Sequence, residues 1–385
     1  MASLAGMDTA ERNAALLAAV GVPTTTVAGL RAMVAQGAEP FYQETRNGES
    51  VMMRAGAAGR LDLVQALLEL GAPWNAVDRR GQCAGTVALK SGHQEVVDCM
   101  VKAGVRSELF FIEQARKQKA AAAAADPVVA AAAAAAAAVA RATQATATTP
   151  AAGNPEFVKQ KLKYVGRGAA AALVDERGAG VMMQWEKPLM EAHAKVLCMF
   201  STKEDRGADV LNVGFGMGLI DTAIQNMANV AGGKAPRTHT IIEAHPDVYA
   251  KMLRDGWDRI PGVRIFHGRW QDVLRERGHE LGDFDGVFFD TFDDVDHMRD
   301  FHAHLQTLVR PGGIYSFFNG LCPENIVFQG VACQCIQIEL GALGFDTDFY
   351  PMSVACSEPE LWEGTPFRYY FRSDYHLPLC RRRLT

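Results

Sequence analysis

Short apolar runs alternate with longer amphipathic stretches over the second half of the chain. Seven runs rich in β-branched or aromatic residues are candidate strands, at 209–215, 238–244, 263–268, 284–291, 313–319, 347–353 and 367–373. The stretches between them carry apolar residues at helical spacing, at 219–230, 247–257, 270–277, 298–309 and 326–344. Regular alternation of strand and helix predicts a mostly parallel sheet with helices on both faces. A ligand of such a sheet binds beyond the carboxyl ends of its central strands.

Two stretches of the first hundred residues repeat one another at an offset of 33, so that Gly59 corresponds to Gly92. Two short helices and a turn at this period resemble the ankyrin repeat over roughly 47–105, although the usual T-P-L-H opening is degenerate. A poorer third copy is a candidate at 27–40. Such repeats serve either as a platform for binding another protein or as a helical cap that stabilises its neighbour.

An alanine-rich stretch at 117–154, which ends in threonine, proline and glycine, separates these repeats from the strands and helices. Alanine favours helix but buries too little surface to fold a domain, so we interpret this stretch as a linker. The predicted division is ankyrin-like helical repeats at 1–116, a linker at 117–154 and a catalytic domain at 155–385.

Composition narrows the class of protein. The 385 residues are 49% hydrophobic and 22% charged, which is typical of a soluble protein of two or three domains. A net charge of −5 argues against broad attraction to nucleic acid or membranes, and we interpret Arg381, Arg382 and Arg383 as a solvated tail. The eight scattered cysteines indicate reduced, mostly buried thiols. With no apparent membrane span or targeting segment, the expected location is the cytoplasm and the nucleus.

The stretch VLNVGFGMGLID, from Val210 to Asp221, predicts a strand, a tight glycine turn and the start of a helix. Such a turn leaves backbone N–H groups free for an anionic or polar ligand. Close packing of a helix on a sheet is the alternative explanation for its three glycines.

Two further strand ends are predicted to lie beside this turn. Glu243 ends the second strand, where a carboxylate can accept both hydroxyl hydrogens of a ribose or simply cap the following helix. Trp270, after the third strand, can cover an adenine ring, with Arg269 and Gln271 offering polar edges, or can pack at a strand-to-helix corner.

Asp290 ends the fourth strand beside the glycine turn and is the strongest catalytic candidate. Asp293 and Asp294 are interpreted as capping or solvated charges. Glu186 begins a helix before the sheet, where it is either an ordinary first-turn carboxylate or a group leaning over the ligand. Asn319, after the fifth strand, either reaches the pocket or forms a turn.

A cluster of histidines, His297, His302 and His304, does not predict a metal site. Spacings of five and two residues do not place three ligands on one helix face, so we expect no metal. The sequence contains no serine elbow or phosphate loop of the G-x-x-x-x-G-K type, which argues against hydrolases and nucleotide triphosphatases.

Taken in order, the segments VMMQWEKPLM, VLNVGFGMG, IIEAHPDVY, GRWQDV, FDGVFFDTF and RPGGIYSFFN resemble the guanidinoacetate methyltransferases and their relatives, the fungal-type (type IV) protein arginine N5-methyltransferases. The resemblance spans roughly 155–385. It implies an α/β fold, a seven-stranded doubly wound, Rossmann-like methyltransferase sheet, preceded here by the α-helical ankyrin-like repeats. Those repeats favour the protein-modifying branch, because the guanidinoacetate enzymes are compact single domains.

The resemblance also implies the cofactor S-adenosyl-L-methionine and the residues that bind it. The matching positions are Tyr164, Met190, Phe215, Gly216, Met217, Gly218, Leu219, Ile220, Glu243, Ala244, His245, Arg269, Trp270 and Asp290.

Glu186 and Asp290 match the acidic pair of this family. A guanidinium is protonated and a poor nucleophile, so methyl transfer requires neutralising its charge and removing a proton. We hypothesise that Glu186 holds the two terminal nitrogens in a bidentate pairing while Asp290 orients the attacking nitrogen and accepts its proton. The internal nitrogen would then face the methyl group, which gives N5-methylarginine.

The expected partner is a protein carrying the target arginine, for which the resemblance suggests a ribosomal protein; no direct binding to nucleic acid or membranes is expected. Two rival functions stay open at this point. One is methylation of guanidinoacetate to creatine, and the other is an ankyrin adaptor whose methyltransferase fold no longer catalyses. An adaptor would not need to retain Glu186, Gly216, Glu243 and Asp290 together.

Overall fold

The computed structural model describes residue 4 and residues 6–354 apart from 125–156, 200–205 and 292–294, and then residues 356, 359–362, 365 and 368–384. Most of the predicted linker therefore lies outside the described residues, as do Asp293 and Asp294. The chain forms two compact units. The first unit consists of Met1–Ala134 together with Leu321–Ile336, and the second of Ala135–Gly320 and Gln337–Thr385.

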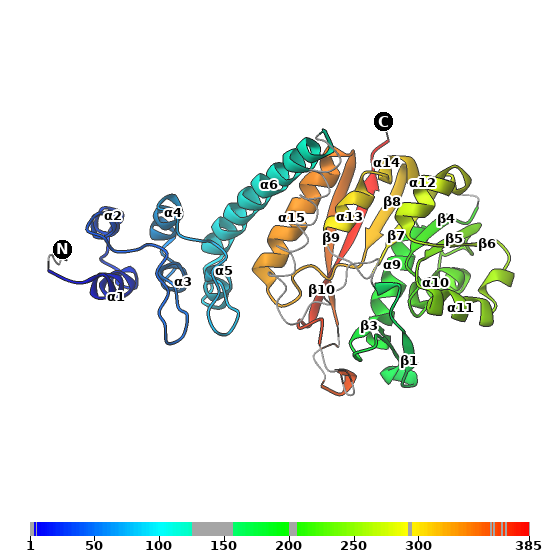
Figure 1. The fold of residues 1–385 in the computed structure, drawn as a ribbon, viewed down its shortest axis with the longest axis horizontal. Helices are drawn as coiled ribbons and strands as arrows, with labels where there is room; N and C mark the ends of the chain where they lie inside the picture. The colour runs from blue at the N-terminus through cyan, green and yellow to red at the C-terminus, as the bar shows by residue number, and fades with distance from the viewer. Residues whose placement is uncertain are drawn as a thin grey trace. The chain divides into compact units, whose positions relative to one another are not determined.

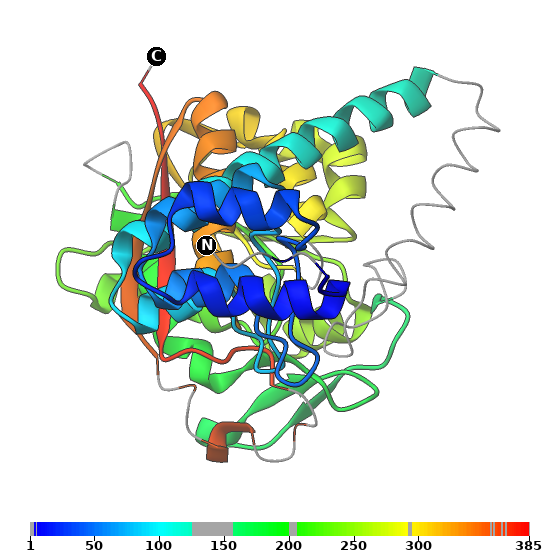
Figure 2. The same ribbon diagram turned by 90° about the vertical axis from the view of Figure 1, so that its left-hand side faces the viewer.

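Helices build the first unit, and Figure 2 shows the two nearest the N-terminus running side by side. They are α1 (Thr9–Val20), α2 (Val27–Ala35), α3 (Val51–Ala57), α4 (Leu61–Glu69), α5 (Ala84–Lys90) and α6 (Gln94–Ala124). Side-chain caps start several of them; Asp8, for example, accepts the backbone N–H of Glu11 at 2.8 Å in a capping box. The pairs α3–α4 and α5–α6 are displaced by 33 positions, as the repeat predicts.

A segment from far along the chain completes the first unit. The first half of helix α15 (Ile326–Ala342) runs beside α6 (Figure 1). Phe328 meets the Trp74 ring edge-on at a centroid distance of 5.4 Å, and Val331 packs with Val105. Asn325 adds polar contacts, accepting the Thr86 hydroxyl at 3.2 Å and donating to the Gly81 carbonyl at 3.2 Å. Leu321–Ile336 is therefore an integral part of the helical unit.

A seven-stranded sheet forms the centre of the second unit, in the order β6-β5-β4-β7-β8-β10-β9. Its strands are β4 (Asp209–Val213), β5 (Thr238–Glu243), β6 (Val263–His267), β7 (Phe284–Phe289), β8 (Val309–Phe317), β9 (Phe345–Ser353) and β10 (Asp374–Arg382). The first five pair in parallel, whereas β10 pairs antiparallel with both β8 and β9. Every residue of β4 and β7 is buried, as expected for central strands covered on both faces.

Helices lie on both sides of this sheet. Figure 1 shows α10 and α11 on one side and α12 to α14 on the other. Their bounds, with those of α9, are α9 (Lys187–Met199), α10 (Leu219–Gln225), α11 (Pro246–Arg254), α12 (Trp270–Leu281), α13 (Val295–His302) and α14 (Leu305–Leu308). The 3₁₀ turns are η1 (Gly168–Ala170), η2 (Gln184–Glu186), η3 (Met227–Asn229), η4 (Trp257–Arg259) and η5 (Pro359–Trp362).

A small antiparallel sheet precedes the large one. It consists of β1 (Lys163–Val165), β2 (Ala172–Val174) and β3 (Gly180–Met183), in that order. The sequence patterns did not predict these strands, because runs of three or four residues are too short to show alternation. Strand β3 leads directly into η2 and places Glu186 at the start of α9.

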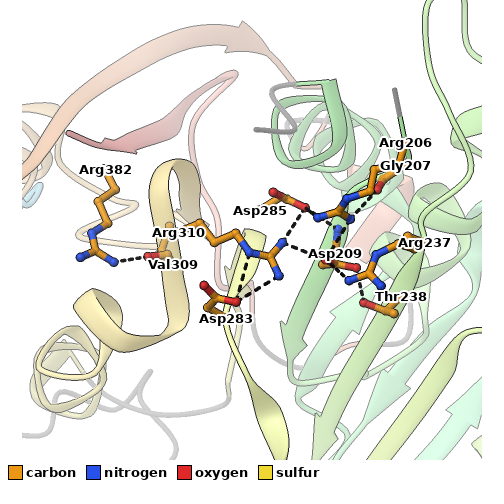
Figure 3. Close-up of polar contacts among 10 residues, drawn as sticks. All are labelled: Arg206, Gly207, Asp209, Arg237, Thr238, Asp283, Asp285, Val309, Arg310 and Arg382. Atoms are coloured by element: carbon orange, nitrogen blue, oxygen red, sulfur yellow. Dashed lines mark hydrogen bonds and ion pairs between the residues drawn. The ribbon is translucent and has the colours of Figure 1, made fainter. Parts of the chain in front are cut away.

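An ion-pair network ties together the amino ends of four strands (Figure 3). Asp209 on β4 lies at its centre and accepts hydrogen bonds from Arg206 at 2.9 Å, Arg310 at 2.8 Å and also from Arg237. Asp285 on β7 accepts the backbone N–H of Asp209 and a guanidinium N–H of Arg310, both at 2.9 Å. These carboxylates lie at the edge of the sheet opposite to the one where parallel strands of this fold bind ligands.

The predicted α/β class, a sheet of seven strands, six of the predicted strand positions and the helices on both faces are confirmed. Two expectations were wrong. The strand predicted at 367–373 is irregular over its described residues, and the seventh strand is β10, which begins at Asp374. Arg381 and Arg382 belong to β10, and Arg383 pairs with Asp346 at 2.8 Å, so these arginines are not a free tail.

None of the helices in the described part of the chain combines the length and the apolar character that a membrane span requires. Six of the eight cysteines are buried, and Cys99 and Cys322 are half-buried.

Candidate active site

The glycine turn between β4 and α10 brings backbone unusually close to the next strand. Gly214 has φ of +97°, and a Cβ added there would lie 1.9 Å from the carbonyl oxygen of Asp290. Gly218, with φ of +70°, is the left-handed residue that starts α10. Only glycine fits both positions without strain, so the turn can approach a bound molecule through its backbone.

Glu243, at the end of β5, holds this turn in place. Its carboxylate accepts the backbone N–H of Phe215 at 2.8 Å and that of His245 at 2.6 Å. Burial raises the pKa of Glu243, and these N–H donors act in the opposite direction. Tyr164, on β1, covers the turn from the other side by donating its hydroxyl to the Gly216 carbonyl at 2.8 Å. Glu243 and Tyr164 thus both contact the predicted ligand turn.

Unsatisfied polar atoms surround the carboxyl ends of β6 and β7. Within the described residues, no hydrogen-bond partner is present for the buried Arg269 Nε, Trp270 Nε1, Thr291 Oγ1 or the amide of Gln271. Buried polar groups without partners are costly, so a set of them at strand ends fits a polar ligand that would complete their hydrogen bonds. Heteroaromatic rings with amino groups, such as adenine, offer acceptors and donors of this kind.

Some predicted cofactor residues sit deeper than expected for direct contact. Met190 is fully buried in the core with Ile220 and Phe288. The Trp270 ring is 4% exposed and packs edge-on against Phe301 at a centroid distance of 5.2 Å. Their contact with a cofactor stays a prediction.

Two carboxylic acids lie near the glycine turn, Glu186 buried and Asp290 half-buried. Glu186, 2% exposed, lies at the end of η2, and its Oε1 accepts the Met183 N–H at 2.7 Å and the Tyr369 hydroxyl. Asp290 follows β7, where its N–H donates to the Val213 carbonyl at 2.9 Å and fixes it beside the turn. The structure therefore brings together the two acids that the sequence singled out.

Burial disfavours the charged forms of both acids, and repulsion by Asp290 adds to the effect on Glu186. Burial, reinforced by the Asp290 charge, raises the pKa of Glu186 to about 8, although the Tyr369 and Met183 donors oppose the shift. Burial raises the pKa of Asp290 to about 7. Two acids that ionise near neutral pH in one water-poor site can accept a cation and a proton, and perturbed groups of this kind cluster at functional sites.

Sequence reasoning missed the aromatic residues around Glu186. The ring of Trp185 lies 5.9 Å from those of both Trp362 and Tyr369 and 5.7 Å from that of Tyr370. Trp362, Tyr369 and Tyr370 come from the segment between β9 and β10, which was interpreted in part as a strand. The run of aromatic residues at 367–371 was the available signal, but it fits a strand equally well.

A buried chain of hydrogen bonds links α9 to β8, β10 and the turn after β8. His193 on α9 bonds Ser316 at 2.8 Å and Tyr375 at 2.9 Å, and burial lowers the pKa of His193 to about 3, so its ring is neutral. Tyr375 in turn accepts the backbone N–H of Asn319 at 2.7 Å. The Asn319 side chain donates to the His376 carbonyl at 2.8 Å, so this asparagine anchors the turn after β8.

The histidine cluster is dispersed. His302 is buried and bonds the Tyr315 hydroxyl at 3.2 Å, while His304 is exposed; the side chain of His297 lies outside the described residues. Over the described chain, no group of three or more His, Cys, Asp or Glu side chains is arranged to hold a metal ion.

We expect Glu186→Gln to stabilise the protein increasingly as pH rises. The folded state holds the Glu186 proton up to about pH 8, whereas the unfolded chain releases it near its ordinary pKa of about 4.3. The free energy of unfolding of the native protein therefore decreases as pH rises from about 4.3 to about 8. Glutamine removes this decrease, so the advantage of Glu186→Gln over the native protein should grow by about 2 kcal/mol between pH 6 and pH 8. Urea unfolding across this range measures it. Glu191→Gln, an exposed acid on α9 paired with Lys187, is the control, and an equal difference at every pH would refute the prediction.

Comparisons with known proteins identify the family of the chain. A family model described as guanidinoacetate N-methyltransferase matches residues 165–327. The chain is 33% identical to protein arginine N-methyltransferase 2 of Aspergillus oryzae over 386 residues, 93% of this chain and 88% of the relative. The protein of that name from Cryptococcus neoformans is 29% identical over 404 residues, 98% and 99% of the two chains. The one from Saccharomyces cerevisiae is 31% identical over 331 residues, 82% and 76%. The chain belongs to the protein arginine N-methyltransferase 2 family.

Proposed function

We propose that the protein transfers a methyl group from S-adenosyl-L-methionine to the internal (N5) guanidino nitrogen of arginine in a protein substrate. The observation that carries the proposal is the pair of acids beside the glycine turn, the buried Glu186 and the half-buried Asp290, both with raised pKa values. Family membership supports arginine in a protein as the acceptor, because the relatives are named protein arginine N-methyltransferases.

The cofactor would be held by the glycine turn and by the polar groups at the ends of β5 and β6. Its sulfonium supplies an electrophilic methyl group. The residues proposed to bind it are Tyr164, Met190, 215–220, 243–245, Arg269, Trp270 and Asp290, and the unsatisfied Arg269 and Trp270 nitrogens favour a polar ring there.

The two acids have different proposed roles toward the substrate. A guanidinium entering this site displaces protons from Glu186 and Asp290, because its positive charge favours their ionised forms. Glu186 then neutralises the cation and holds a terminal nitrogen. Asp290 orients the attacking nitrogen and accepts its proton as the new N–C bond forms.

The N-terminal helices are proposed to be ankyrin-like repeats that present the substrate. Their period of 33 and their paired helices support this. The division into repeats at 1–116, a linker at 117–154 and a catalytic domain at 155–385 is part of the same proposal. A ribosomal protein as partner, and the cytoplasm and nucleus as location, are proposals from the family resemblance.

Mass spectrometry of the products tests the function. The purified chain is incubated with labelled S-adenosyl-L-methionine and, in separate reactions, guanidinoacetate or a ribosomal protein extract. We expect label in a protein as N5-methylarginine, identified by fragmentation that separates internal from terminal methylation. Creatine as the main product would show that guanidinoacetate, and not a protein, is the substrate. Cofactor binding without any transfer would favour the non-catalytic adaptor.

A further inference from the structure

Tyr369 occupies one oxygen of Glu186. Its hydroxyl donates to Oε1, which already accepts the Met183 N–H at 2.7 Å. A carboxylate oxygen has two lone pairs, so Oε1 is saturated by these two donors. No hydrogen bond from the described residues reaches Oε2, which leaves that oxygen as the acceptor for a substrate.

The ring of Tyr369 is held from three sides, so its hydroxyl has a defined position. It lies 5.9 Å from the Trp185 ring and meets the Trp362 ring edge-on at 5.1 Å. On the third side it crosses Gly180 of β3, where an added Cβ would come within 3.0 Å of the tyrosine ring. Trp362 is itself fixed, because its indole N–H donates to the Cys356 carbonyl at 2.7 Å.

The groups that face Glu186 make this contact electrostatically important. Asp290 repels its charge, and among the described residues the Met183 N–H and the Tyr369 hydroxyl are the donors that favour it. The charges of both carboxylates also act on Tyr375, where they help to raise its pKa, but the Tyr375 hydroxyl is hydrogen-bonded to His193 and to the Asn319 N–H. Tyr369 is therefore the side-chain donor that favours the ionised form of Glu186 and holds its carboxyl group in one orientation.

We propose that Tyr369 is a positioning residue that makes Glu186 meet the substrate guanidinium through Oε2 alone, so that the guanidinium is shared between Glu186 and Asp290. This inference rests on the proposed function and offers an alternative to the bidentate pairing hypothesised from the sequence. A fork of both Glu186 oxygens would fix the guanidinium by its two terminal nitrogens independently of Asp290. When the guanidinium is shared between the two acids, its orientation depends on the position of Asp290 as well as on that of Glu186.

Tyr369→Phe tests the inference in the full-length protein, with Tyr370→Phe as the matched control. Tyr370 is the adjacent buried tyrosine, and it donates to the Asp374 carbonyl at 2.8 Å rather than to a carboxylate of the site. In Tyr369→Phe the freed Oε1 can take a second guanidinium nitrogen. We expect kcat to fall about tenfold while KM stays equal or decreases, and the acid limb of the pH profile to move to higher pH. Tyr370→Phe should show none of these changes.

A second variant changes the place of the hydroxyl without removing it. Gly180→Ala pushes on the Tyr369 ring and should reproduce the kcat loss and the shifted acid limb in weaker form. Unchanged kcat, KM and pH profile in Tyr369→Phe would overturn the proposal.

A ligand-free measurement separates this proposal from the proposed function. The stabilisation by Glu186→Gln grows with pH up to the folded-state pKa of Glu186. In a Tyr369→Phe background this pKa should be higher, so the growth should continue to a higher pH than in the native background. An unchanged upper limit would count against the positioning role. If the native protein methylates guanidinoacetate instead of a protein, the function as proposed fails. The same kcat and KM comparison on guanidinoacetate, which is also a guanidinium, still decides the role of Tyr369.

Discussion

Replacement of Asp290 by asparagine should lower the rate of methyl transfer about a thousandfold, since a positioned general base contributes on the order of 10² to 10⁴ in rate. Asparagine preserves the shape of the side chain but cannot accept the proton of the attacking nitrogen. The backbone of residue 290, which bonds Val213 and lies against Gly214, is unaffected by the change. Binding of S-adenosyl-L-methionine, measured by calorimetry, should therefore stay within a few-fold of that of the native protein.

Asp272→Asn is the control for this experiment. Asp272 also follows a strand, in the first turn of α12, but its side chain is 40% exposed and pairs with Arg275. Its replacement should leave both cofactor binding and methyl transfer unchanged. An equal loss of the two in Asp290→Asn would show that Asp290 serves the cofactor site rather than the proton transfer.

Asp209→Asn should reduce the free energy of unfolding by about 3 kcal/mol, in the range found when one partner of a buried ion pair is removed. The Asp209 side chain is 2% exposed and meets Arg206, Arg237 and Arg310, which hold its pKa well below the ordinary value. Because the folded pKa is depressed, this stabilisation is present above about pH 4 and is lost as pH falls through the folded value. Denaturant unfolding at pH 7 measures the loss.

Arg237→Gln provides the contrast within the same network. Arg237 is 52% exposed, so water already screens its charge, and its loss should cost less than about 1 kcal/mol. Methyl transfer measured well below the melting temperature should stay native in both variants, because the network lies at the amino ends of the strands. Equal costs for Asp209→Asn and Arg237→Gln would mean that burial of the carboxylate does not determine the stabilisation.

Much of the site could be predicted because chain order and strand ends determine it. Parallel strands place their carboxyl ends at one edge, so Gly214, Glu243 and Asp290 had to lie together once β4, β5 and β7 were identified. The two acids could also be chosen from chemistry, since a guanidinium needs both a counter-charge and a base.

The contribution of Tyr369 could not be predicted in the same way. Its segment lies between β9 and β10, and residues 368–373, which include Tyr369 and lead into β10, form neither helix nor strand, so no periodicity encodes its contact with Glu186. The aromatic run at 367–371 resembles a strand, while the real strand β10 contains Pro378 and polar residues that weaken its pattern. Proline is tolerated in β10 because the antiparallel pairing with β8 covers only Cys380 and Arg381.

Because Leu321–Ile336 packs in the helical unit, the N-terminal helices cannot be removed without exposing part of α15. A shortened chain of residues 157–385 would keep α15 but lose the side chains that cover Val327 and Val331. The first half of α15 would then expose an apolar stripe to water, which favours precipitation or recruitment of chaperones. Shortening the protein to its methyltransferase half would thus require polar replacements on that face of α15, and the loss of the front end during evolution would face the same obstacle.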